Sequence, residues 1–260
     1  MQHRSRNLVT LFAALLLFFE AFAGWAGRAE RLRFLGGEFV VYRVDLNSDD
    51  LTLHWKDSAG KPLGTFSRLR QELGARAPDL NFAMNAGIFS RNQEPLGLHI
   101  EASKVLRELN LGNREGGQVN FYLKPNGVFY IADQVPGIAE STAFAGLGLH
   151  PTLACQSGPL LVLDGKIHPV FQPGSTNFHW RSGVGLTKDH QIVFAISKNA
   201  LNFHDFARLF KERLECDDAL YLDGDICAIY LPALGYRGED SGTRFAAMFA
   251  VTTKGSSRSR

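Results

Sequence analysis

Two carboxylates lie between apolar runs near the end of the chain, in the stretch ALYLDGDICAIYL at residues 219–231. Asp223, Gly224 and Asp225 could form a simple turn, because an Asp-Gly pair flanked by hydrophobic residues is a strong hairpin signal. Carboxylates at the point where a buried strand reaches the surface could instead form the acidic part of an active site. The choice depends on which other polar residues could work with them.

An asparagine follows another apolar run, in the stretch NFAMNAGIF, where Asn85 precedes the small residues Ala86 and Gly87. Asparagine tolerates the left-handed backbone region, so a tight turn is one interpretation. The other is an amide that points into a pocket, with Gly87 allowing a ligand to approach the backbone. Spacing alone favours the turn.

A serine precedes a third apolar run, in CQSGPLLVLDGK, which places Ser157 and Gly158 directly before a strand. A Ser-Gly-Pro turn is ordinary, and the surrounding residues do not form the nucleophile elbow of the α/β hydrolases. Backbone groups beside a Gly-Pro pair can also bind an anion or a sugar hydroxyl. Taken alone, the pattern favours a structural role.

An arginine begins a fourth apolar strand, in NFHWRSGVGLT, where Arg181 follows an aromatic residue and precedes small ones. Most arginines are solvated on the protein surface. A guanidinium fixed against the start of a strand could instead bind a phosphate or carboxylate through a two-pronged fork of hydrogen bonds.

Metal and nucleic-acid chemistry receive no support from the sequence. The following histidines have no ligand-like spacing beside an acid: 99, 150, 168, 179, 190 and 204. We therefore expect neither a metal site nor a cofactor. Residue types do not exclude a Ser-His-Asp hydrolase, although its strand-turn-helix signature is missing. The net charge is +2 and the basic residues are scattered, so no nucleic-acid partner is expected.

The first 23 residues have the three-part layout of a secretory signal peptide: the positive MQHRSRN, the apolar LVTLFAALLLFF and the small AFA before Gly24. The apolar run is about twelve residues long, whereas a membrane-spanning helix needs roughly twenty. We expect an exported protein, periplasmic or secreted, with no stable membrane span after cleavage. An uncleaved anchor is the alternative.

The cysteines Cys155, Cys216 and Cys227 do not define a metal site. An oxidising compartment permits one disulfide among them and leaves one thiol over. Their pairing stays open, because a buried free thiol fits the sequence equally well.

The organisation of the chain indicates one strand-rich α+β domain over residues 24–252, followed by a disordered tail at 253–260. The chain shows no internal repeat and no break in composition. We expect two main helices packed on one side of a mixed or antiparallel sheet.

Both helices have recognisable ends. The helix at 65–74 can be capped by Thr65 and terminated by Gly74 in the left-handed conformation. The helix at 202–214 can be capped by Asn202 and presents one apolar stripe.

The strands are expected mainly from apolar alternation and turn residues. Residues 39–46 and 51–55 resemble a pair of strands joined by the turn NSDD. Buried strands are expected at 80–84 and 244–252. Hairpin turns are expected at Asn126-Gly127, Asp164-Gly165 and Asp189-His190.

Taken together, the motifs NAGIF, QSGPLLV, RSGVG and YLDG, in this order and at these intervals, resemble the phosphodiester glycosidase family. The resemblance covers about residues 35–252. It implies an α+β fold and hydrolysis of a sugar-1-phosphodiester at the anomeric C–O bond. The family's polar motif residues fall on Asn85, Gly87, Ser157, Gly158, Arg181, Asp223 and Gly224.

One position departs from the family pattern. Better-known members continue the last motif as LDGG with a serine-rich turn, whereas this chain has LDGDICA. Asp225 therefore replaces a glycine, which places this chain in a compact bacterial branch and leaves its substrate open.

The resemblance implies a mechanism. Asp223 would act as nucleophile or base on an oxocarbenium-like state, and Arg181 would neutralise the phosphate. Asn85, Ser157 and the Gly158 backbone would position sugar or phosphate oxygens. The substrate would be a sugar phosphodiester or an envelope glycan. Two alternatives stay open: a non-catalytic glycan- or envelope-binding domain of the same fold, and an exported esterase or phosphodiesterase.

Overall fold

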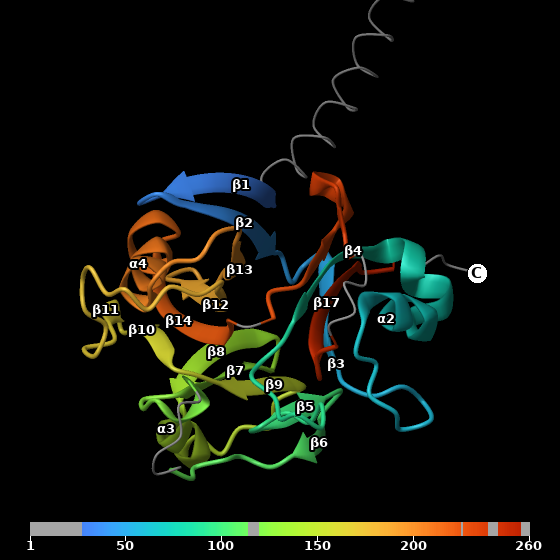
Figure 1. Ribbon diagram of the computed structural model, residues 1–260. Helices are drawn as coiled ribbons and strands as arrows, with labels where there is room; N and C mark the ends of the chain where they lie inside the picture. Colours follow the sequence, from blue (N-terminus) through green and yellow to red (C-terminus); the bar gives the residue numbers. More distant parts are fainter. Residues whose placement is uncertain (1–27, 114–119, 225, 239–243, 256–260) are drawn as a thin grey trace, which may run out of the picture.

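The computed structural model of the chain describes residues 28–113, 120–224, 226–238 and 244–255. The predicted signal peptide, Asp225 and residues 256–260 of the predicted tail lie outside this part. The described part of the chain folds into three antiparallel sheets with a few short helices, a strand-rich α+β arrangement (Figure 1).

The first sheet has seven strands. In spatial order they are β1 (Ala29–Phe34), β2 (Gly37–Val44), β13 (Ile192–Ser197), β12 (Ser182–Thr187), β14 (Cys216–Asp223), β10 (Leu160–Leu163) and β11 (Lys166–Ile167). Strands β13 and β12 are buried along almost their whole length, because one face meets the other sheets and the opposite face is covered by a helix.

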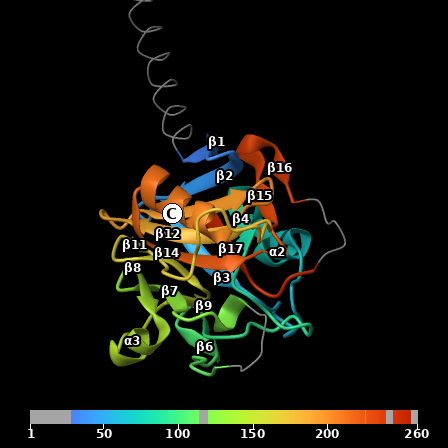
Figure 2. The same cartoon turned by 60° about the vertical axis from the view of Figure 1, so that its left-hand side comes forward.

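The second and third sheets have five strands each. The second runs β16 (Tyr236–Arg237), β15 (Ile229–Leu231), β4 (Leu80–Asn85), β17 (Met248–Thr253) and β3 (Asp49–His54). The third runs β6 (Lys104–Arg107), β5 (His99–Glu101), β9 (Leu153–Ser157), β7 (Gly127–Ala132) and β8 (Val135–Glu140). In both views β7, β8 and β9 of the third sheet lie below β14 of the first, with which they are in contact (Figure 1, Figure 2).

An aromatic cluster joins the three sheets in the main core. Phe194 of the first sheet lies 5.3 Å from Phe82 of β4, measured between ring centroids, and 6.2 Å from Phe129 of β7. Phe249 of β17 lies 5.1 Å from Phe194 and 5.7 Å from Phe129. The three sheets therefore share one set of buried rings.

The helices are α2 (Phe66–Leu73), α3 (Ser141–Gly146) and α4 (Phe203–Arg208), with 3₁₀ turns at Gly74–Asp79, Asn120–Tyr122 and Pro232–Leu234 and a π-helical turn at Leu209–Arg213. The Thr65 hydroxyl accepts from Arg68 N at 3.3 Å, and Gly74 follows α2 with a positive φ. Asn202 Oδ1 accepts from Asp205 N at 2.8 Å at the start of α4. Both expected N-caps are confirmed, whereas Gly74 is not in the expected left-handed helical conformation, because its ψ is −117°.

The two main helices pack against different sheets. Leu69 of α2 lies in a cluster with residues of β4 and β17, whereas Phe206 of α4 lies in a cluster with residues of β2, β13 and β14. The expectation that both helices share one sheet is therefore not confirmed. No helix of the described residues is long and apolar enough to span a membrane.

Two expected hairpins are confirmed and one is wrong. β10 and β11 turn at Asp164-Gly165, and β12 and β13 turn near His190, which has a positive φ. At the third position the chain turns at Asp133-Gln134, between β7 and β8, and Gly127 is instead the first residue of β7. Asn126 cannot serve as the exposed corner of a turn, because its buried amide donates to Phe121 O at 2.9 Å.

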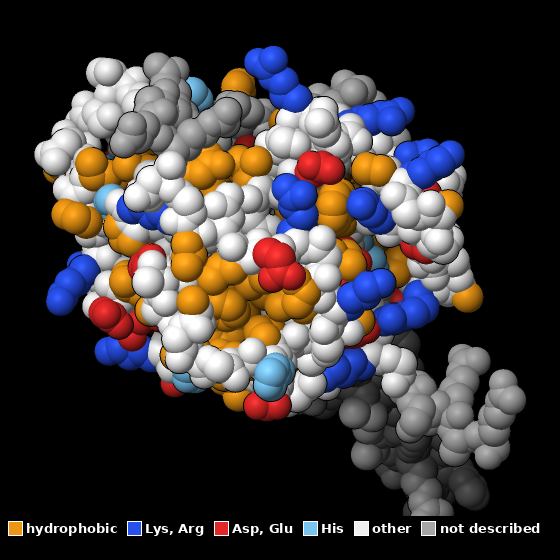
Figure 3. Space-filling model, turned by 90° about the horizontal axis from the view of Figure 1, so that it is seen from below, with side chains coloured by type: hydrophobic (Ala, Val, Ile, Leu, Met, Phe, Trp, Pro, Cys, Tyr) orange, Lys and Arg blue, Asp and Glu red, His pale blue; other side chains and the backbone are white. Residues whose placement is uncertain are grey.

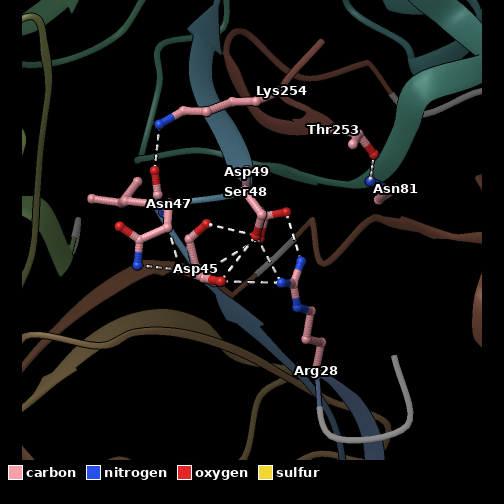
Figure 4. Close-up of polar contacts among 9 residues, drawn as sticks. Arg28, Asp45, Asn47, Ser48, Asp49, Asn81, Thr253 and Lys254 are labelled. Carbon is pink, nitrogen blue, oxygen red and sulfur yellow. Dashed lines mark hydrogen bonds and ion pairs between the residues drawn. The ribbon is translucent and has the colours of Figure 1, made fainter. Parts of the chain in front are cut away.

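The expected pairing of the first two strands is also wrong. β2 pairs with β1 and β13 in the first sheet, whereas β3 pairs with β17 in the second. The turn between β2 and β3 thus passes the chain from one sheet to the next. Arg28 stabilises this crossing by ion pairs to Asp49 at 2.8 Å and to Asp45 at 3.2 Å (Figure 4).

The end of the last strand is tied to the same turn. β17 continues to Thr253, whose Oγ1 accepts from Asn81 Nδ2 at 2.9 Å (Figure 4). Lys254 N donates to Ser48 O, in the turn between β2 and β3. Ordered chain therefore extends past residue 252.

On the face seen from below, hydrophobic side chains gather near the centre, with acidic and basic ones scattered around them (Figure 3).

Candidate functional site

Asp223 is the last residue of β14 and is almost fully buried, with 8% of its surface exposed. Its Oδ1 accepts a hydrogen bond from Gly224 N at 2.6 Å, and its Oδ2 accepts one from Asn85 Nδ2 at 3.3 Å. Its backbone is held by the Ser182 hydroxyl, which accepts from Asp223 N and donates to Asp223 O. Two donors from different parts of the chain therefore hold the carboxylate in position.

Asn85 is the last residue of β4 and is fully buried. Its Oδ1 accepts from Ala228 N at 2.9 Å, and its backbone N donates to Ala228 O at 3.3 Å. Because Ala228 N can only donate, the Asn85 oxygen must face it, which directs the amide nitrogen to Asp223. The predicted proximity of this amide to the carboxylate is therefore present.

Ser157 is the last residue of β9 and is also fully buried. Its hydroxyl donates to Leu222 O at 2.9 Å and accepts from Ile88 N at 3.3 Å. It thus links the residue before Asp223 to the segment that follows Asn85. The ends of three strands, one from each sheet, meet at this point: β14, β4 and β9. The Ser157 hydroxyl connects the segments that contain them.

The motif glycines allow close packing of backbone. A Cβ at Gly87 would lie 2.9 Å from Gln156 O, and one at Gly158 would overlap the Asn126 side chain. A Cβ at Gly224 would overlap the Tyr221 hydroxyl and lie 2.9 Å from Trp180 O. In this structure the three positions bring chain segments together, which is a tighter constraint than turn formation alone.

Arg181 lies directly before β12, and its surface is entirely buried. Its Nε donates to Leu201 O at 2.8 Å, and its Nη2 donates to the backbone oxygen and Oδ1 of Asn177 at 3.0 and 3.1 Å. Its guanidinium carbon lies 3.5 Å from the ring centroid of Phe203. Burial lowers the pKa of the guanidinium, an effect that Tyr221 opposes.

The remaining guanidinium nitrogen, Nη1, has no hydrogen-bond partner among the described residues. A buried donor without a partner is costly and is a group that a ligand oxygen could satisfy. The structure therefore leaves a single nitrogen for a ligand, rather than the two-pronged fork expected from the sequence.

Two groups at this site were not selected from the sequence. Ser182, which holds the backbone of Asp223, is the small residue after Arg181, and only its position in the RSGVG motif could have indicated it. Tyr221 lies beneath Gly224 and faces Arg181, with 5.7 Å between the guanidinium carbon and its ring centroid. In the sequence it was one apolar residue of a buried strand.

The three cysteines are free thiols in the structure. Burial raises the pKa of Cys155 and of Cys216 to about 12. Cys227 is half-buried beside the site, and its Sγ lies 3.7 Å from Asp223 O. Within the described ranges no group of three or more His, Cys, Asp or Glu side chains is arranged to hold a metal ion.

Comparison with known sequences finds a match in the part of the chain that contains this site. Residues 79–226 match the model of a family described as phosphodiester glycosidase. A protein of Escherichia coli strain K12, named uncharacterized protein YigE, is 36% identical over 191 residues, which cover 74% of this chain and 73% of that protein.

Comparison with solved structures shows the same fold. The catalytic domain of zebrafish N-acetylglucosamine-1-phosphodiester alpha-N-acetylglucosaminidase, auto-inhibited by its pro-peptide, gives a TM-score of 0.59 at 14% identity, over 87% of this chain and 82% of that one. A hypothetical protein from Synechocystis gives 0.51 at 16% identity, over 87% of this chain and 61% of that one.

Proposed function

Because the chain belongs to the phosphodiester glycosidase family, we propose that it is an exported hydrolase that cleaves the anomeric C–O bond of a sugar-1-phosphodiester. One observation carries the proposal: the Asp223 carboxylate is fixed by Asn85 and Gly224 where three sheets meet, within the residues that match the family. Export rests on the sequence of the first 23 residues.

The chemistry follows from the bond that breaks. Cleavage at an anomeric carbon passes through an oxocarbenium-like state, which a nearby carboxylate can stabilise, attack or supply with activated water. Both oxygens of Asp223 accept hydrogen bonds, which fixes the carboxylate in place for this role. The bond between the anomeric carbon and the phosphate oxygen breaks, and the oxygen of water bonds to that carbon. One proton of the water passes to Asp223 or to the leaving phosphate, and the products are the free sugar and a phosphate monoester.

The leaving group is a phosphate monoester, which is already anionic and therefore needs less protonation than an alcohol. Neutralisation of its charge matters more, and the buried guanidinium of Arg181, which faces Tyr221, is the cation beside Asp223 that could supply it. Asn85 would orient the carboxylate or a sugar oxygen. Ser157 and the Gly158 backbone would position the segments around the substrate oxygens.

Turnover and product identity test this proposal. Asp223→Asn should reduce the hydrolysis of sugar-1-phosphodiesters by at least about a hundredfold while the protein remains folded. Asp189→Asn, in the exposed turn after β12, is the matched control and should keep full activity. Full turnover by a folded Asp223→Asn variant would contradict the assignment. Release of a sugar phosphate instead of free sugar would show P–O cleavage, and hence an esterase or phosphodiesterase.

A non-catalytic glycan-binding domain is the second candidate. The complete burial of Arg181, Nη1 included, favours it, because no nitrogen of the guanidinium reaches the surface where a substrate phosphate would bind. Saturable binding of sugar phosphodiesters without any turnover by the purified parent protein would support this candidate.

A further inference from the structure

Two exposed aromatic side chains lie directly before Arg181. Phe178 and Trp180 each have 54% of their surface exposed, and they are the two aromatic members of the large exposed hydrophobic residues in the described part of the chain. The other members are Leu35, Val105, Leu111, Val135, Leu147, Leu149 and Val170. Elsewhere in that part the phenylalanines and tryptophans are buried or half-buried, so this pair is exceptional in its exposure.

The backbone gives both rings a common direction. His179, between them, forms a bridge with Leu201, in which His179 N donates to Leu201 O and Leu201 N donates to His179 O. A bridged residue lies in extended chain, where the side chains on either side of it point to the same face. Phe178 and Trp180 therefore present one aromatic surface.

Buried contacts fix this surface in place. Arg181, whose side chain is fully buried, binds the backbone oxygen and side chain of Asn177 through Nη2. Arg181 N also donates to the Ser197 hydroxyl at 2.8 Å. The backbone is thus held on both sides of the aromatic pair. The rings are therefore exposed on a fixed segment of the chain.

The backbone that carries the aromatic surface borders the candidate active site. The carbonyl oxygen of Trp180 lies 2.9 Å from the position of a Cβ at Gly224, and Ser182 pairs with Asp223 across β12 and β14. Exposed aromatic groups beside a carboxylate are characteristic of binding sites, since an apolar surface is unfavourable in water unless a ligand covers it.

We propose that Phe178 and Trp180 form a stacking platform for the sugar ring of the substrate, with the anomeric carbon presented to Asp223. The C–H face of a pyranose is apolar, and its partly positive hydrogens match the negative face of an aromatic ring. The anomeric carbon on which Asp223 acts belongs to the sugar ring. A surface that borders Gly224, the neighbour of Asp223, therefore lies closer to the sugar than to the aglycone. The proposal rests on the substrate class given under the proposed function.

Binding and kinetics together test the platform. The parent protein is titrated with the methyl α-glycosides of glucose, galactose, mannose and N-acetylglucosamine, while tryptophan fluorescence is followed. We expect a saturable change with at least one glycoside, which Trp180→Ala removes. For the matching sugar-1-phosphodiester, Trp180→Ala should raise KM at least tenfold with a smaller effect on kcat, and Phe178→Ala should raise it less. Trp180→Phe should restore most of the affinity.

Val170→Ala, another exposed hydrophobic position, is the matched control and should leave KM unchanged. An unchanged KM in Trp180→Ala, or no saturable glycoside binding by the parent protein, would overturn the platform. The platform would also be overturned if the rise in KM of Trp180→Ala depended on the size of the aglycone and not on the identity of the sugar. If the parent protein binds a glycoside through Trp180 but hydrolyses no sugar-1-phosphodiester, the platform stands and the hydrolase is rejected. Hydrolysis by Trp180→Ala with both KM and kcat unchanged would keep the hydrolase and reject the platform.

Discussion

Asn85 Nδ2 donates a hydrogen bond of 3.3 Å to Asp223 Oδ2, across 138 positions of sequence and between two different sheets. Each residue ends its strand, so the contact lies where β4 and β14 stop. The amide cannot turn over without losing its bond from Ala228 N. The carboxylate therefore has a fixed neutral donor as its neighbour.

Asn85→Asp would replace this neutral donor with a second carboxylate of the same shape. Two carboxylates that share a site repel each other, so the pKa of the Asp223 group should rise. The acidic limb of the pH–rate profile should then move to higher pH, by about 1 unit or more. Asn81→Asp, on the same strand, is the control and should leave the profile unchanged. An unshifted profile in Asn85→Asp would show that Asp223 does not govern the rate.

Ser157→Ala would remove a fully buried hydroxyl and leave Leu222 O and Ile88 N without this partner. Such losses cost about 1–3 kcal/mol of unfolding free energy, measurable by urea denaturation. The serine should not be labelled by a fluorophosphonate, because its hydroxyl proton is committed to Leu222 O. Covalent labelling at Ser157 would instead show that it is a nucleophile. Ser90→Ala serves as the control in a surface turn.

Gly224→Ala would place a methyl group against the Tyr221 hydroxyl and Trp180 O. We expect a loss of about 1–3 kcal/mol in stability, together with most of the activity, because the segment that carries Asp223 must shift. Tyr221→Phe in the same protein should recover part of the loss, since it removes the nearest atom. Gly146→Ala, where a Cβ meets nothing within 4 Å, is the control. Equal stability of the two alanine variants would contradict the steric argument.

The thiols should differ sharply in reactivity. Burial raises the pKa of Cys155 and Cys216 to about 12, so neither forms appreciable thiolate at pH 8. A thiol reagent such as dithionitrobenzoate should therefore label at most one site in the native protein, Cys227, and three after unfolding. Rapid labelling of Cys155 or Cys216 in folded protein, located by peptide mass analysis, would contradict the structure.

The ionisation of Asp45 should make the stability of the folded protein depend on pH. The backbone N–H of Asn47 and the Ser48 hydroxyl lower the pKa of Asp45 below its usual 3.8. The ionised form therefore stabilises the fold above pH 3.8, and this contribution is lost as the pH falls through the lowered folded-state pKa. Asp45→Asn should reduce Tm at pH 7 and have little effect near pH 2. A Tm difference that does not change with pH would argue against this assignment.

Local signals in the sequence predicted the parts of the fold that depend on neighbouring residues. Thr65 and Asn202 cap their helices, and Asp164-Gly165 forms a hairpin, because each needs only a few adjacent residues. The predicted hairpin at Asn126-Gly127 failed because the Asn126 side chain is drawn into the core by Phe121 O. The pairing of β2 with β3 failed because β17, from the end of the chain, pairs with β3.

The candidate site was predictable to a similar extent. The resemblance brought Asn85, Ser157 and Asp223 into one group, and the structure places them together. The surroundings of Arg181 could not be predicted, because Leu201 and Asn177, which take up its donors, are brought to it only by the tertiary fold. Asp225 lies outside the described residues, so its role stays a prediction.

The convergence of three strand ends has a consequence for when the protein can act. No single sheet contains Asn85, Ser157 and Asp223, and the shared phenylalanine rings must pack before the sheets align. A chain with a single sheet undocked holds the three residues apart. The geometry of the site thus arises only when all three sheets are docked, so partial unfolding of any one of them takes the site apart.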